Sequence, residues 1–159
     1  LEYNGSWTAV PGTLNVGRRS LSGTGTGTQT ACIGASGYGA SGYTTSSEEY
    51  DGTNWTSTPN LNTARGQSMM NSEGSTISAI VAGGDAPSSP NINTEIYDGS
   101  AWTTSGNMAA QRSQAGSGGT GSAMWVAAGS PSSPSNAAPA RTAEAFTVIT
   151  STIKTLSVS

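Results

Sequence analysis

Residues 95–102, which read EIYDGSAW, decide the fold of this chain because the same pattern stands 47 residues earlier, as EEYDGTNW at 48–55. In both stretches a tyrosine is followed by Asp-Gly and then by a tryptophan. Asp-Gly is a strong signal for a tight hairpin, because glycine adopts a positive φ at little cost. Each of these segments is therefore predicted to be an antiparallel hairpin.

The pattern recurs along the chain with a period near 47 residues. Tyr3, Tyr50 and Tyr97 are each 47 residues apart, and Phe146 follows 49 residues later. Three further kinds of residue keep this spacing: the tryptophans Trp7, Trp55 and Trp102, the arginines Arg18, Arg65 and Arg112, and the acidic residues Glu2, Glu48 with Glu49, Glu95 and Glu144. A fixed period of this length indicates a repeat architecture.

Each period is predicted to contain four short strands. Between the arginine and the aromatic residue, a cluster of Gly and Ser separates two strands, and the second strand ends in small residues. These endings are Gly83-Gly84 in the best copy, Ser36-Gly37 in the first and Gly129-Ser130 in the third. Small residues let backbones approach closely. An all-β fold of four-stranded antiparallel sheets repeated around an axis, which is a β-propeller, is expected.

Diglycine, an acidic residue with tyrosine, then tryptophan and arginine in this order resemble the kelch repeat. The resemblance implies a half blade over 1–15 and three blades at about 16–62, 63–109 and 110–159, with the last outer strand at 153–158. Propellers close with roughly 4–8 blades, so about three and a half blades need completion. Either an upstream part of the polypeptide or another copy could supply it. We expect residues 1–159 to be one kelch-like segment, the C-terminal part of a longer chain.

Several phrases resemble a narrower group of proteins. The strings TGTQTA at 26–31, EEYDGTNW at 48–55 and LNTAR at 61–65 are similar to the Ser/Thr/Gly-rich kelch-like repeats of virion proteins from bacteriophages of marine and freshwater bacteria, cyanophages included. This resemblance implies a structural protein on the virion surface.

Composition argues against several classes of function. The 159 residues suit one domain, only 9% are charged, and the formal net charge is -3. The stripe of Lys and Arg that nucleic-acid binding needs is missing, and no apolar run approaches the ~20 residues of a membrane span. With no histidine and Cys32 as the single cysteine, the chain cannot form an internal disulfide, a Ser-His-Asp triad or a thiolate-imidazole metal cluster. We expect no enzyme activity, catalytic residue, metal or cofactor.

The periodic residues allow a functional and a structural interpretation. Arg18, Arg65 and Arg112 could grip an anion, the tryptophans could stack on sugars, and Glu48, Glu95 and Glu144 could supply carboxylates for glycoside hydrolysis. A packing residue must recur in register, whereas a binding residue need not. We therefore expect the periodic arginines, aromatic rings and glutamates to be structural.

The loops that break the period are the better place for binding. Residues 37–47 and 85–94 join the second strand of a copy to the third, and they differ in length and composition. Loops on a rigid scaffold commonly carry binding residues. Tyr38 and Tyr43 are predicted to form a sugar platform, with Asp85 and Asn91 as hydrogen-bond partners. The alternative is that these loops are solvated spacers.

Together these inferences predict a non-enzymatic virion protein, a tail fibre or other appendage that attaches to a glycan or protein on the host surface. The alternative is a protein that decorates or assembles the capsid or tail. The expected partners are other virion proteins, copies of the chain itself and possible host glycans, without nucleic acid or membrane insertion.

Overall fold

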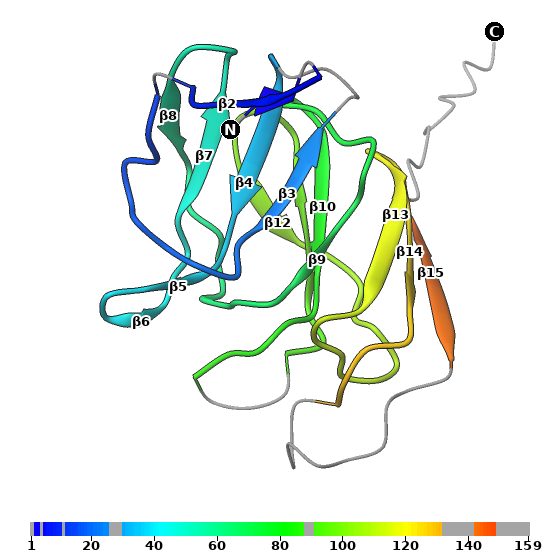
Figure 1. Cartoon of the computed structure of the whole chain (residues 1–159). Coiled ribbons are helices and arrows are strands. Elements are labelled where there is room, and N and C mark those ends of the chain that lie inside the picture. The colour runs from blue at the N-terminus through cyan, green and yellow to red at the C-terminus, as the bar shows by residue number, and fades with distance from the viewer. Residues whose placement is uncertain are drawn as a thin grey trace, which may run out of the picture.

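The structure, a computed structural model, describes residues 2–3, 5–10, 12–25, 30–87, 91–131 and 142–148 (Figure 1). This part of the chain contains strands and turns but no helix. All pairings between its named strands are antiparallel. The expectation of an all-β fold is confirmed.

The strands form three larger sheets and two separate hairpins. Sheet one has the order β3 (Ser22–Gly25), β4 (Cys32–Ala35), β7 (Ser47–Tyr50), β8 (Trp55–Thr58). Sheet two consists of β9 (Met69–Met70), β10 (Ala79–Ala82), β11 (Thr94–Tyr97), β12 (Trp102–Thr104). Sheet three consists of β13 (Gly116–Thr120), β14 (Ala123–Ala127), β15 (Ala143–Thr147). The hairpins pair β1 (Glu2–Tyr3) with β2 (Trp7–Thr8), and β5 (Tyr38–Gly39) with β6 (Gly42–Tyr43).

Each of the three sheets falls within one copy of the sequence repeat, and neighbouring strands within a sheet follow one another along the chain. The exception is the β5–β6 hairpin, which is inserted between β4 and β7. The described strands do not close into a ring, and the outer strand expected at 153–158 lies outside the described residues. The number of blades stays a prediction.

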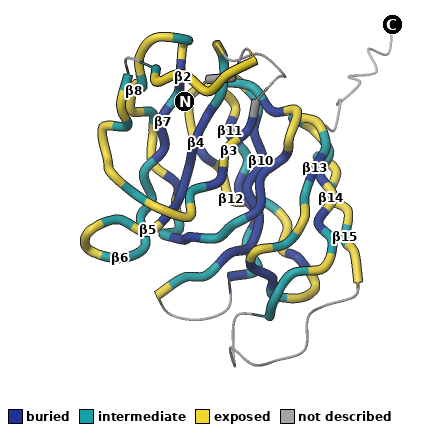
Figure 2. The backbone as a smooth tube through the Cα atoms, in the orientation of Figure 1, coloured by how far each residue is buried: buried dark blue, intermediate teal, exposed yellow. Residues whose placement is uncertain are grey.

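The sheets stack face to face, with sheet two in the middle. Ala79 and Val81 of β10 belong to a buried apolar cluster that includes Ile33 of sheet one. The alternate residue Ile80 belongs to a second cluster, which includes Met124 of sheet three. Successive side chains of a strand point to opposite faces, so β10 is buried on both sides (Figure 2).

The first strands of the three sheets lie next to one another. Strand β9 contacts both β3 and β13, and the Ser117 hydroxyl donates to the Met70 carbonyl at 3.0 Å. Just before these strands, the Gln67 N–H donates to the Ser20 carbonyl at 3.0 Å and the Gln114 N–H to the Gln67 carbonyl at 3.1 Å. The three sheets are thus joined along their inner edges by one repeated backbone contact.

The second strand ends in two consecutive residues with positive φ in every copy: Ser36 and Gly37, Gly83 and Gly84, Ala128 and Gly129. An ideal Cβ at Gly84 would lie 2.6 Å from the Gly66 carbonyl oxygen, so only glycine fits there. In the third copy the two positive-φ residues are Ala128 and Gly129, one residue earlier than the predicted Gly129-Ser130. The β13–β14 connection is shorter than the β9–β10 connection, so β14 ends earlier in its repeat.

The aromatic pairs of the hairpins differ in burial. The rings of Tyr97 and Trp102 are stacked with centroids 5.0 Å apart, and both are buried. Trp55, at 5.1 Å from Tyr50, is half-buried, and Phe146 packs against the second cluster.

Trp7 departs from the expectation that the periodic tryptophans lie in the core, because it is 69% exposed. It belongs to the β1–β2 hairpin, to which no further strand is paired in the described part of the chain. The Trp7 ring is therefore not on the face of a complete sheet. Tyr3 pairs with Trp7 through the backbone, and its side chain lies outside the described residues.

Candidate ligand-binding site

The periodic arginines form one repeated ion pair in each of the three sheets. Arg18 pairs with Glu48, Arg65 with Glu95 at 2.6 Å and Arg112 with Glu144 at 2.9 Å. Each arginine lies just before the first strand of its sheet, and each glutamate lies on the third strand. All three arginine side chains are buried.

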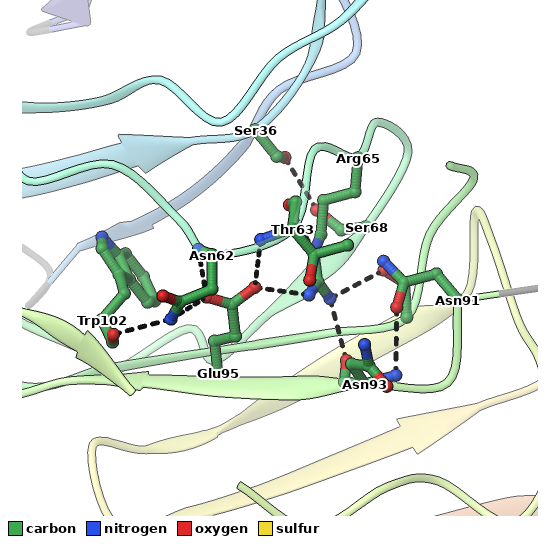
Figure 3. Close-up of polar contacts among 10 residues, drawn as sticks. Ser36, Asn62, Thr63, Arg65, Ser68, Asn91, Asn93, Glu95 and Trp102 are labelled. Carbon is green, nitrogen blue, oxygen red and sulfur yellow. Dashed lines mark hydrogen bonds and ion pairs between the residues drawn. The ribbon is translucent and has the colours of Figure 1, made fainter. Parts of the chain in front are cut away.

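The cluster around Arg65 shows what this pair does (Figure 3). Arg65 donates to the carbonyls of Gly83 at 3.1 Å and Asn93 at 2.8 Å. The Glu95 carboxylate also accepts the backbone N–H of Asn62 at 2.7 Å and that of the next residue at 3.2 Å. The pair therefore fixes the entering loop, the diglycine turn and the third strand in one place.

These contacts engage the repeated arginines and glutamates in structural hydrogen bonds, so their charged groups are poorly placed for catalysis. Glu48, Glu95 and Glu144 each accept an arginine N–H and a backbone N–H. Among the described residues, no group of three or more His, Cys, Asp or Glu side chains is placed to hold a metal ion.

A different site forms where the β5–β6 hairpin meets the loops that enter sheets one and two. It is a pocket of about 240 Å³. Its lining residues are Arg19, Ser20, Tyr38, Tyr43, Gly66 and Gln67. Figure 1 shows the hairpin at the left of the molecule, well below the β1–β2 hairpin, which lies near the top. The volume suits a single small ring better than the drug-sized ligands of pockets of roughly 300–1,000 Å³.

The two tyrosines of the hairpin stand opposite each other. Tyr38 and Tyr43 are register partners, and their rings meet edge to face, with centroids 5.1 Å apart. Tyr38 is 37% exposed and Tyr43 is half-buried. Each tyrosine combines an apolar ring with a polar hydroxyl group that can form a hydrogen bond.

Arg19 lies over the ring of Tyr38. Its guanidinium carbon lies 4.6 Å from the Tyr38 ring centroid, and backbone hydrogen bonds of 2.8 and 3.1 Å hold the two residues together. Four arginines lie in the described part of the chain, and Arg19 is the one without a carboxylate partner there. The pocket thus contains an exposed, uncompensated positive charge.

Asp85 lies beside the pocket, next to the lining residue Gly66. Its backbone is paired with that of Gly66, by hydrogen bonds of 2.8 and 2.9 Å. Burial raises the pKa of Tyr43, and the charge of Asp85 and the neighbouring Tyr38 raise it further. The Tyr43 hydroxyl therefore stays protonated at neutral pH and can donate a hydrogen bond. Asp85 Oδ1 is buried and has no hydrogen-bond partner in the structure.

The structure brings together three of the four predicted binding residues. Tyr38 and Tyr43 line the pocket, and Asp85 lies beside it. Asn91 does not line it: the residue is 3% exposed and lies near Arg65 (Figure 3), where it accepts the Asn93 N–H at 3.0 Å. Burial in this cluster removes Asn91 from contact with a ligand in the pocket.

Sequence reasoning missed Arg19, Ser20 and Gln67. A signal for Arg19 was present, because it is the one arginine among the first four without a counterpart 47 residues away, where Gly66 stands. Ser20 and Gln67 are harder to find, since they occupy equivalent positions of the repeat.

Two other cavities are less suited to binding a sugar. One of about 50 Å³ lies between sheets two and three, where it is lined by Met108, Met124 and Phe146 among others, and it is too small for a sugar. A hollow of about 350 Å³ is lined partly by Glu49 and Asp51. Glu49 already accepts the Tyr97 hydroxyl at 3.2 Å, and Asp51 accepts two N–H groups of its own turn.

No protein-family profile matches the chain, and no curated protein matches it. In the described residues there is no helix of the length and apolarity needed to cross a membrane.

Proposed function

We propose that this chain is a non-enzymatic binding module, a kelch-like propeller segment whose tyrosine pocket takes a sugar ring. The observation that carries the proposal is the Tyr38–Tyr43 pair, with Tyr38 exposed and Tyr43 half-buried, on a hairpin that has no counterpart among the described strands of the other sheets. Tyr50 and Tyr97 are buried in contact with a tryptophan. Rings committed to packing lie inside, whereas this pair lies at the surface beside a pocket.

A binding role also agrees better than catalysis with the distribution of polar groups. The chain has no histidine, and the repeated glutamates are engaged in ion pairs with arginines. A pocket lined by two tyrosines, one cation and small polar groups, with a carboxylate beside it, suits recognition of a polar ligand.

The resemblance to kelch-like bacteriophage proteins supports a location of this binding module on a virion. We propose a tail fibre or another appendage, with a glycan of the host surface as the ligand.

Replacing Tyr38 and Tyr43 together by serine tests the pocket. We expect binding to glycans on an array to fall about tenfold or more, which corresponds to ~1.4 kcal/mol, because both ring faces are lost. The melting temperature should change by only a few degrees, since a ring pair is worth about 0.5–1.5 kcal/mol beyond its burial.

Trp7→Ser is the matched control, because it removes an exposed ring from the β1–β2 hairpin, which lies well above the β5–β6 hairpin in Figure 1. It should leave glycan binding unchanged. Equal binding by the double variant and the parent would contradict the proposed site. A large fall in melting temperature would show that the two rings belong to the core.

A second function, assembly with other virion subunits, is favoured by Trp125 on β14. Trp125 pairs with Ala145, which follows Glu144, just as Ile33 and Ile80 pair with the residues that follow Glu48 and Glu95. Both isoleucines are fully buried, whereas Trp125 is 49% exposed. The repeat thus predicts a further sheet over Trp125, and we propose that a second copy of the chain supplies it.

The purified 159-residue protein is accordingly expected to form dimers or larger assemblies. Trp125→Ser should increase the monomer fraction, because it removes the ring from this uncovered face. Light scattering after size-exclusion chromatography measures both states, with Trp7→Ser as the control for loss of an exposed tryptophan. A monodisperse monomer of the parent protein would contradict assembly through this face.

A further inference from the structure

We infer that the pocket selects acidic sugars, with Arg19 binding the anionic group; this rests on the proposed sugar-binding function. In the described part of the chain, Arg18, Arg65 and Arg112 are buried and paired with glutamates, and Arg19 alone presents its guanidinium to solvent without a carboxylate partner.

The position of Arg19 suits this role. Its guanidinium lies over the face of Tyr38, and contact with an aromatic ring restricts a side chain that would otherwise be mobile. A planar guanidinium held in this way can donate two parallel hydrogen bonds from its edge to a carboxylate. Lysine offers a point charge without this geometry.

Besides Arg19, the pocket has Tyr43 in its lining and Asp85 beside it. The carboxylate of Asp85 has one buried oxygen, Oδ1, without a hydrogen-bond partner, and the Tyr43 hydroxyl is held in its protonated form. A carboxylate accepts hydrogen bonds from sugar hydroxyls but repels an anion. We therefore expect the acidic group of the ring to lie toward Arg19 and away from the Asp85 charge, with its hydroxyls toward Tyr43.

Ser20 and Gln67 complete the polar lining of the pocket. The Gln67 N–H donates to the Ser20 carbonyl. A ligand in the pocket would therefore contact the side chains of Ser20 and Gln67. Both residues hold a positive φ in the backbone contact that joins sheets one and two. The polar lining is thus fixed to the scaffold and not to a separate loop.

The experiment compares matched glycans on an array: uronic acids, sulfated sugars and phosphorylated sugars, each beside its uncharged parent sugar. We expect the parent protein to bind acidic members and to discriminate against their neutral partners. A preference for carboxylated over sulfated or phosphorylated members would identify the planar anion as the favoured group. Binding should weaken as salt increases, because exposed charges are screened.

Arg19→Gln should weaken binding of the best acidic glycan about tenfold or more, as expected for the loss of charge-assisted hydrogen bonds. Arg19→Lys should recover part of the affinity, and the melting temperature of both variants should match that of the parent. Ser72→Asp is the matched control, because it changes the net charge by the same amount on an exposed residue between β9 and β10. It should leave binding unchanged.

The outcomes separate the two proposals. If the neutral partners bind as well as the acidic glycans, or if Arg19→Gln binds like the parent, the acidic specificity is overturned while the sugar pocket stands. If no glycan binds to the parent protein, the proposed function itself is overturned.

Discussion

Glu95→Gln is expected to lower the free energy of unfolding by about 3–5 kcal/mol, the cost of leaving a buried charge without its partner. The Arg65 and Glu95 side chains are both fully buried, with Arg65 Nη2 2.6 Å from Glu95 Oε1. Burial lowers the pKa of Arg65, and the charge of Glu95 offsets only part of this effect. Without that charge, Arg65 retains only neutral carbonyl partners.

Glutamine also disturbs the entering loop. In the native protein both carboxylate oxygens accept hydrogen bonds, one from the backbone N–H of Asn62 and one from that of Thr63. An amide has one acceptor oxygen, so one of these donors would face an NH₂ group. Urea unfolding followed by tryptophan fluorescence measures the loss.

Two further glutamates provide graded controls. Glu144 makes the same kind of ion pair, but its side chain is 23% exposed and Arg112 also donates to the Thr142 hydroxyl. Glu144→Gln should therefore cost less than Glu95→Gln. Glu73 is exposed, and Glu73→Gln should change stability by no more than about 0.5 kcal/mol. Equal effects of all three changes would contradict a structural role for the buried pair.

The all-β fold and its repeated structural residues could be predicted because these residues recur at a fixed spacing. An arginine that pairs with a glutamate in one sheet must do so in the next, and the 47-residue spacing of Arg18, Arg65 and Arg112 reflects this shared contact. The register of the third copy was harder, because a shorter connection between β13 and β14 moves the paired positive-φ residues to Ala128 and Gly129. A one-residue shift of this kind depends on strand pairing, which the residue spacing alone does not reveal.

The candidate site could be predicted only in part. Tyr38 and Tyr43 stood out because they break the period, and the structure places their rings in contact. Asn91 also breaks the period, yet it is buried near Arg65. Sequence irregularity therefore indicates where the scaffold changes, but not whether the new side chain faces solvent or the core. The sequence did distinguish Arg19 from Arg18, because Gly66 stands 47 residues after Arg19 and Arg65 stands 47 residues after Arg18. Only the structure shows that Arg19 is exposed and lacks a carboxylate partner among the described residues.

Trp102→Ala is expected to cost about 3–5 kcal/mol, the range for truncating a large buried aromatic residue. Trp102 is 5% exposed and belongs to the cluster between sheets one and two. Its ring stacks on that of Tyr97 at 5.0 Å. Alanine would leave a cavity beside Tyr97 and remove this contact, so the loss should appear as a lower urea midpoint.

Trp7→Ala is the matched control for the same change at an equivalent position of the repeat. Because Trp7 is 69% exposed, its truncation should cost less than about 1 kcal/mol. Trp102→Phe keeps an aromatic ring against Tyr97 and should fall between the two, which keeps the comparison measurable if the alanine variant does not fold. Similar losses for Trp102→Ala and Trp7→Ala would mean that the stacked pair of sheet two contributes no more than an exposed ring. The assignment of Trp102 to the core between sheets one and two would then be wrong.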